Sequence, residues 1–172
     1  MKSTSVLAIL ITLTLTGCGK DYNAMTFEPQ SQQHVQDIIV GYLRDTVATL
    51  PAGTVIDAGR FARPGQNSLC DDAESGPVAP MRFHTVGELK ATGEETSIVA
   101  AVGVIWRRWG WHVVEREGFR TPNRFGYSPD GYRLQIVSTG AGHPPVVQAS
   151  SPCYPRPVAT DDVAFPVIIT AA

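Results

Sequence analysis

The chain has 172 residues, 43% of them hydrophobic, with 14 Lys and Arg against 16 Asp and Glu and a formal net charge of −2. This size and apolar content suit one folded domain with an ordinary hydrophobic core. The weak charge balance, spread along the chain, argues against nucleic-acid binding and against electrostatic docking to anionic lipid.

The first eighteen residues have the pattern of a secretory signal. Lys2 precedes a short apolar run over 6–15, and Leu15-Thr16-Gly17-Cys18 then places small residues beside a cysteine. A positive start, an apolar core of about 7–15 residues and a small-residue cleavage site define such signals. The run is shorter than the roughly 20 apolar residues of a membrane-spanning helix. The last four residues resemble the bacterial lipobox, which implies acylation of Cys18, with chains such as palmitate, and cleavage before it. Ordinary secretion with an incidental cysteine is the alternative.

This pattern predicts how the chain is divided. We expect a lipoprotein signal peptide over residues 1–17, a lipidated polar tether over 18–30, an α+β envelope domain over 31–155 and a C-terminal tail over 156–172. The mature protein is then expected at the cell membrane, lipid-anchored on the extracytoplasmic face. The tether would let the domain stand clear of the bilayer.

Two segments of the domain show helical periodicity. The first has Ser31 as a candidate N-cap and ends before Pro51 and Gly53. The second begins at Thr92-Gly93-Glu94-Glu95, which has the form of a capping box, and ends at Gly110, where a left-handed residue is favoured.

Strands are predicted between and after the helices. They are expected over 54–61, 81–86, 111–117, 132–138 and 145–150, with a long loop over 63–80, a turn over 128–131, and an apolar patch over 165–169 that either adds an edge strand or stays unpaired. This order predicts an α+β fold with two helices packed on one face of a mostly antiparallel sheet of about five strands.

Two cysteines remain once the lipobox has used one. Cys70 and Cys153 form an even pair in an oxidising compartment, which favours a structural disulfide. A metal site would need more ligands at suitable spacing, and none stand near either cysteine. The carboxylates in 71–74 lack the alternating spacing of a calcium loop and are interpreted as a solvated loop. We expect no metal and no cofactor.

Motifs for known catalytic chemistry are missing from the sequence. The four histidines have no metal-binding spacing, and neither the serine-hydrolase elbow nor a phosphate-binding glycine loop occurs. A catalytic set assembled from distant residues is left open.

The tryptophans and the segment that follows them are the candidates for partner binding. Trp106 and Trp109 fall on the apolar stripe of the second helix, whereas Trp111 opens the next strand and is a candidate for ligand contact; core packing is the alternative.

Segment 118–132 mixes aromatic and arginine side chains, a composition typical of recognition surfaces. Arg120, Arg124 and Tyr127 are its candidate contact residues. The alternative is a long hairpin whose aromatic residues cover the open face of the sheet.

Three short motifs carry a family resemblance. Trp109-Gly110-Trp111, Pro129-Asp130-Gly131-Tyr132 and Ser151-Pro152-Cys153 occur in the order and approximate spacing seen in small lipoproteins and secreted proteins of mycobacteria and related actinobacteria. The resemblance covers about residues 31–155. It implies envelope location and the disulfide; the family has no established activity, so no catalytic residue is carried over.

These expectations favour a non-enzymatic binding or accessory module in the cell envelope. Its partners would be the membrane, through the N-terminal lipid, and an envelope protein, glycan or lipid, with no nucleic acid. The alternative is an envelope hydrolase or transferase. A deep pocket with converging His, Asp, Glu or Ser side chains would favour the enzyme.

Overall fold

The computed structural model describes residues 28–71, 76–140, 142–160 and 163–171. The expected signal peptide, the lipobox with Cys18 and most of the tether lie outside these residues, as do Asp72 and Glu74 of the acidic loop. The described residues form two helices, a one-turn 3-10 helix and a sheet of eight strands. These elements are α1 (Gln32–Ala48), β1 (Val55–Asp57), β2 (Gly65–Leu69), β3 (Met81–Lys90), α2 (Glu95–Arg108), β4 (His112–Val114), β5 (Asn123–Tyr127), β6 (Arg133–Val137), β7 (Val146–Ser150), η1 (Arg156–Val158) and β8 (Ile168–Thr170).

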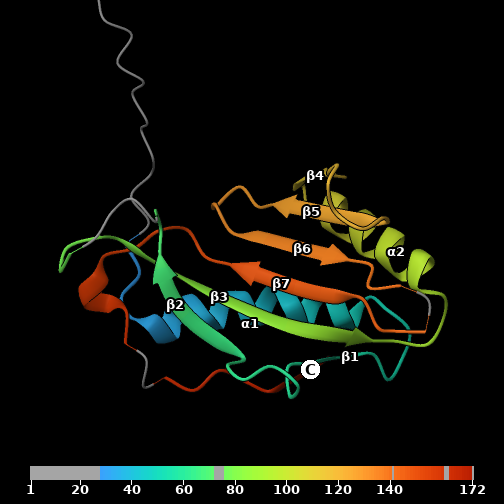
Figure 1. Cartoon of the computed structure of the whole chain (residues 1–172), viewed down its shortest axis with the longest axis horizontal. Helices are drawn as coiled ribbons and strands as arrows, with labels where there is room; N and C mark the ends of the chain where they lie inside the picture. Colours follow the sequence, from blue (N-terminus) through green and yellow to red (C-terminus); the bar gives the residue numbers. More distant parts are fainter. Residues whose placement is uncertain (1–27, 72–75, 141, 161–162, 172) are drawn as a thin grey trace, which may run out of the picture.

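The sheet is antiparallel, in the order β4-β5-β6-β7-β3-β1-β8. The long strand β3 pairs with β7 along one edge, and its other edge is shared by β2 and β1. Both helices lie on the same face of the sheet (Figure 1), where α1 packs against β1 and β8 and α2 packs against β4, β5 and β6. The α+β class is therefore confirmed, and the sheet has more strands than the five expected.

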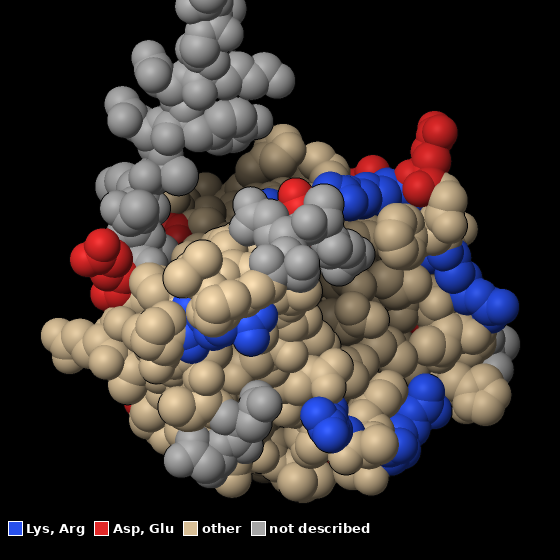
Figure 2. Space-filling model, turned by 60° about the vertical axis from the view of Figure 1, so that its left-hand side comes forward, with Lys and Arg blue, Asp and Glu red and all other residues tan. Residues whose placement is uncertain are grey.

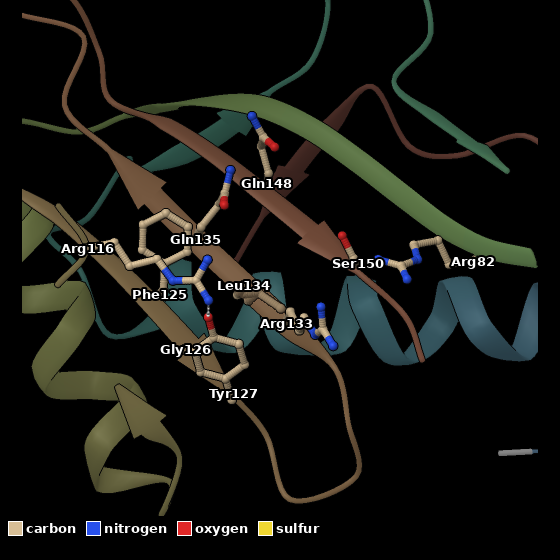
Figure 3. A pocket seen from close by; sticks show the side chains of 10 residues that line it. All are labelled: Arg82, Arg116, Phe125, Gly126, Tyr127, Arg133, Leu134, Gln135, Gln148 and Ser150. Carbon is tan, nitrogen blue, oxygen red and sulfur yellow. Dashed lines mark hydrogen bonds between the residues drawn. The ribbon is translucent and has the colours of Figure 1, made fainter. Parts of the chain in front are cut away.

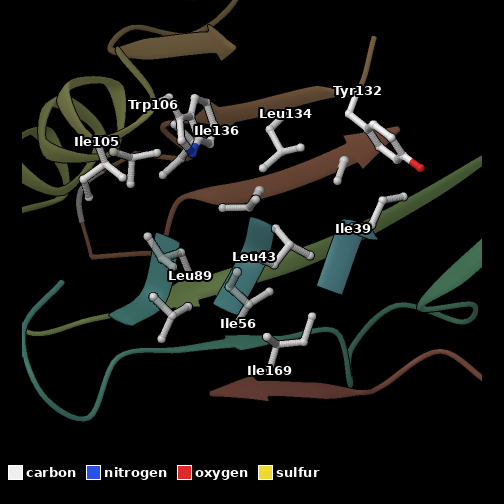
Figure 4. Close-up of a cluster of buried hydrophobic side chains, with 14 of the residues drawn as sticks. Ile39, Leu43, Ile56, Leu89, Ile105, Trp106, Tyr132, Leu134, Ile136 and Ile169 are labelled. Atoms are coloured by element: carbon white, nitrogen blue, oxygen red, sulfur yellow. The ribbon is translucent and has the colours of Figure 1, made fainter. Parts of the chain in front are cut away.

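The start of α1 agrees with the sequence prediction. The Ser31 Oγ accepts a hydrogen bond of 3.1 Å from the backbone N–H of His34, as an N-cap side chain should. The apolar stripe of this helix is buried against the sheet, and it includes Val35, Ile39 and Leu43. These side chains form one layer with residues from α2 and the strands (Figure 4).

The start of α2 differs from the expected capping box. Glu94 occupies the N-cap position and makes no side-chain cap hydrogen bond. The carboxylate of Glu95 instead accepts from the backbone N–H groups of Thr139 and Gly140, at 2.6 and 3.4 Å. The tertiary structure offers Glu95 two donors beyond β6, so its side chain does not turn back to Thr92. At the other end, Gly110 has a φ of +80°, as predicted.

Three strands were not expected where they occur or in their full length. β2 lies inside the predicted loop over 63–80 and pairs with the first half of β3, and β3 continues four residues beyond its expected end at Val86. β5 lies within the segment that was interpreted as a recognition loop or hairpin. The apolar tail does add an edge strand, because β8 pairs with β1.

The predicted disulfide between Cys70 and Cys153 is present, with the two Cα atoms 6.0 Å apart. It connects the end of β2 to the segment after β7. The predicted turn before β6 is also present: Gly131 has a φ of +87°, and its N–H donates to the Ser128 carbonyl at 3.1 Å.

Candidate functional site

Trp111 is buried, so its expected role in ligand contact is wrong. It is 6% exposed, and its ring packs edge-on against Tyr42, with centroids 4.7 Å apart, and next to Trp106 and Trp109. The residue precedes β4 and lies where the two helices and the sheet meet. Its aromatic contacts therefore belong to the core, which was the structural alternative.

Arg124 and Tyr127 lie on opposite faces of β5. Side chains alternate along a strand, so residues three positions apart point to different sides. Arg124 faces α2: its side chain is 18% exposed, forms an ion pair with Glu115 and lies against the Cα of Gly103. Tyr127 faces the side of the sheet without helices.

Arg120 lies elsewhere again. It is exposed and precedes β5, and its Nη1 donates to the Thr139 carbonyl at 2.6 Å, near the start of α2. The structure therefore does not bring the four candidates together. Of these, Tyr127 alone lines the pocket described next.

The side of the sheet without helices, here called the open face, carries rows of mostly polar side chains. The pairing register places Phe125, Gln135 and Gln148 side by side across β5, β6 and β7. The next row runs Tyr127, Arg133, Ser150, His84 and Gln66, from β5 to β2.

A pocket of about 170 Å³ lies where these rows meet, and we call it the open-face pocket (Figure 3). It is lined by Arg82, Arg116, Phe125, Gly126, Tyr127, Arg133, Leu134, Gln135, Gln148 and Ser150.

Arg116 is held in place at both ends. Its Nη2 donates to the Tyr127 hydroxyl, and its Cζ lies 4.8 Å from the centre of the Phe125 ring, a cation–π distance. Its backbone N–H donates to Oδ1 of the fully buried Asn123 at 2.8 Å, and its carbonyl accepts from Nδ2 of the same residue at 3.0 Å. This arginine is positioned before any ligand arrives.

Arg82 enters the pocket from β3 on the opposite side, with its guanidinium directed toward Ser150 (Figure 3). Its Nη2 donates to the Cys70 carbonyl at 2.8 Å and lies 3.9 Å from the Cys153 Sγ, so it is located beside the disulfide. The buried Nε of Arg82 has no hydrogen-bond acceptor among the described residues. An N–H group left in this state is costly and gains from an added acceptor.

The charge of the pocket is positive. Its lining contains three arginines and neither Asp nor Glu, and within the described ranges the ion pairs of the protein involve none of the three. Burial and the nearby Arg82 lower the pKa of His84, in that order of size, which favours its neutral form. The His84 ring is 2.8 Å from the side-chain nitrogen of Gln66.

On the face drawn in Figure 2 the basic side chains do not form one patch. Figure 2 shows Lys and Arg side chains in several separate groups rather than in one continuous basic surface. The absence of nucleic-acid binding stays a prediction from the sequence.

Part of the open face is covered by the segment before β5. Phe125 points to this face yet is 5% exposed, because Phe119 packs edge-on against it at 4.9 Å and Arg116 lies over its ring. This matches the alternative interpretation of segment 118–132, in which aromatic residues cover the sheet.

Sequence reasoning missed most residues of the pocket. The strands that contain Arg82, Arg133 and Gln148 were predicted at least in part. The prediction used only the apolar residues of these strands and did not consider the polar residues that alternate with them. The polar members of the same alternation are the signal that could have found them.

Metal and membrane features can be assessed for the same part of the chain. Among residues 28–71, 76–140, 142–160 and 163–171, no three His, Cys, Asp or Glu side chains are grouped closely enough to hold a metal ion. The helices of those ranges are too short or too polar to cross a bilayer.

No protein-family model, curated protein or solved structure matches the chain. What the protein binds or does must therefore be inferred from the chemistry of its own residues.

Proposed function

We propose that this protein is a lipid-anchored, extracytoplasmic protein of the cell envelope that acts as a non-enzymatic binding or accessory module through the open face of its sheet. The anchor is supported by the lipobox-like Leu15-Thr16-Gly17-Cys18 and by the polar residues that follow it. The resemblance to small actinobacterial lipoproteins supports the same location.

One observation carries the binding role. The helix face of the sheet is filled by the hydrophobic core, whereas the open face presents guanidinium, amide and hydroxyl groups around a pocket. Groups of this kind orient and hold a ligand. A hydrolase or transferase instead needs an activated nucleophile within hydrogen-bond reach of a base, and the lining of this pocket supports the first description better.

The test uses the full-length protein in its own envelope, with a photo-crosslinking amino acid at Gln148. That side chain is exposed on β7 and lines the pocket. The matched control carries the same amino acid at Arg44, which is exposed on α1, on the other side of the sheet. We expect discrete adducts from position 148 that are lost when Arg133→Glu is added, and no such adducts from position 44. Identical adducts from both positions, or none from position 148, would overturn the binding role.

The anchor is tested in parallel with Cys18→Ser. Two or more acyl chains make membrane attachment stable, at about 0.8 kcal/mol per buried methylene. The variant should therefore leave the detergent phase, whereas the parent should remain in it. A variant that partitions like the parent would show that Cys18 is not the attachment point.

A further inference from the structure

We infer that the open-face pocket binds a phosphoryl group, held by Arg82, Arg116 and Arg133. This inference deepens the proposed binding function and depends on it, since it names the ligand class of the same surface.

The pocket arginines have no carboxylate partner in the part of the chain that the structure describes. Elsewhere in the described residues basic side chains have carboxylate partners: Arg60 pairs with Glu88 at 2.7 Å, and Lys90 pairs with Asp57 at 2.6 Å. The pocket lining has three guanidinium groups and no carboxylate. Bringing like charges together on one small surface is unfavourable unless an anion completes the site.

The three arginines reach the pocket from separate parts of the fold. The three arginines come from β3, the segment after β4, and β6, and Figure 3 shows them entering the pocket from different sides. A carboxylate is planar and is satisfied by one guanidinium fork. A phosphoryl group presents oxygens in three directions, which suits donors that arrive separately.

Two of the three arginines are already held in place by contacts within the protein. Arg116 is fixed by Tyr127 and Phe125, and Arg82 is fixed by the Cys70 carbonyl. Ordering a long side chain on binding costs conformational entropy, and little of that cost remains where the side chain is already held. The Nε–H of Arg82, which lacks an acceptor among the described residues, adds a donor beside the site.

The open-face pocket is small. The pocket volume of about 170 Å³ is below the roughly 300–1,000 Å³ of pockets that enclose a whole drug-sized molecule. It fits one charged group, with the rest of the ligand extending over the open face. Gln135, Gln148 and Ser150 lie on that face and offer hydrogen bonds to ester or hydroxyl oxygens next to the phosphorus.

The experiment titrates the full chain, purified in neutral detergent, with inorganic phosphate, with glycerol 3-phosphate and with acetate at constant ionic strength. Calorimetry gives the affinity, and the NMR signals of the arginine Nε–H groups report where each anion binds. We expect both phosphates to bind more tightly than acetate and to shift the Nε–H signals of Arg82 and Arg116.

Arg133→Gln is the principal variant, because Arg133 is exposed and its replacement should leave the fold intact. It should weaken phosphate binding about tenfold or more, the loss expected for one hydrogen bond between charged groups. Arg107→Gln, at an exposed position of α2 on the other side of the sheet, should bind phosphate like the parent. Absence of phosphate binding, equal affinities for Arg133→Gln and Arg107→Gln, or acetate binding as tight as phosphate would overturn the inference.

A further arm separates the sources of the phosphoryl group. Vesicles of phosphatidylcholine, with or without phosphatidylglycerol, are offered to the Cys18→Ser chain so that its own lipid does not contribute. Retention that requires both phosphatidylglycerol and Arg133 assigns the site to a lipid headgroup. Glycerol 3-phosphate binding without such retention assigns it to a soluble or glycan-borne ester, and either result supports the inference. If position 148 forms adducts but phosphate does not bind, the binding role stands and the ligand class is wrong.

Discussion

Gly126 offers the sharpest test of how β5 packs beneath α2. This glycine faces the helices, and a Cβ built on it would lie 2.7 Å from Cε3 of Trp106 and 3.1 Å from Cε3 of Trp111. Both rings are buried, at 0% and 6% exposed, so neither can move aside without disturbing its neighbours. Gly126→Ala should therefore lower the free energy of unfolding by about 1–3 kcal/mol, as overpacked core positions do. Urea denaturation followed by tryptophan fluorescence measures this loss.

The matched control is Gly41→Ala. Gly41 lies within α1, where an added Cβ meets nothing within 4 Å. Alanine should raise the free energy of unfolding there by about 0.5–1 kcal/mol, because glycine is the poorer helix former. If both substitutions stabilise the protein, or if Gly126→Ala is neutral with an unchanged near-ultraviolet circular dichroism spectrum, the tryptophans do not lie against Gly126 and this reasoning is refuted.

Two further predictions concern the disulfide and two phenols, the partly buried Tyr42 and the buried Tyr132. Cys153→Ser should lower the free energy of unfolding by about 4.5 kcal/mol, the chain-entropy figure for a closed loop whose ends are 83 residues apart; two titratable thiols in unreduced parent protein would contradict the bridge. Burial and a hydrogen bond to the Asp130 carboxylate raise the pKa of Tyr42 to about 12, and burial likewise raises the pKa of Tyr132. The folded state then holds these phenol protons more tightly than the unfolded chain, so stability is complete below pH 10, the ordinary tyrosine value, and is lost as pH rises through about 12. Tyr42→Phe should flatten the fall in melting temperature above pH 10, and an unchanged slope would argue against this phenol as its source.

The helices were predictable because their apolar residues repeat with the helical period over several turns. The N-cap at Ser31 and the helix-ending Gly110 could be predicted because each depends only on residues a few positions away in the sequence. The start of α2 was not, because Glu95 bonds to donors at Thr139 and Gly140, more than forty residues away. A local sequence pattern does not show that residues far along the chain offer the side chain of Glu95 other hydrogen-bond donors.

β2 and β5 were missed for a related reason. β2 is Gly-Gln-Asn-Ser-Leu, and even its core-side Asn67 is polar, with its Nδ2 bonded to the Gln32 side chain at 2.7 Å. β5 contains Asn123 and Gly126, residue types that are depleted in strands. Each becomes a strand because a neighbouring strand supplies its hydrogen bonds, and the neighbour is fixed by topology rather than by local preference.

The same limit applies more strongly to the candidate site. Arg82 and Arg133 come together because β7 lies between β6 and β3, although α2, β4 and β5 separate β3 from these strands in the sequence. A count of charges gives a nearly neutral chain, and it carries no information on which arginines have carboxylate partners. In the described ranges all four ion-pair contacts involve Arg60, Lys90 or Arg124, and none involves an arginine of the pocket.

The disulfide connects the stability of the domain to this site. The carbonyl that holds Arg82 belongs to Cys70, and the same Nη2 atom of Arg82 lies 3.9 Å from the Cys153 Sγ. The backbone N–H of Cys70 also donates to the Pro80 carbonyl at 3.0 Å, so the bridge is one of two constraints on the acceptor that orients Arg82. The bridge therefore does more than restrict the unfolded chain: it helps to hold the carbonyl that accepts the hydrogen bond from Arg82. In the proposed binding surface, which is built from separate strands, the bridge is a covalent link at the border of the open-face pocket.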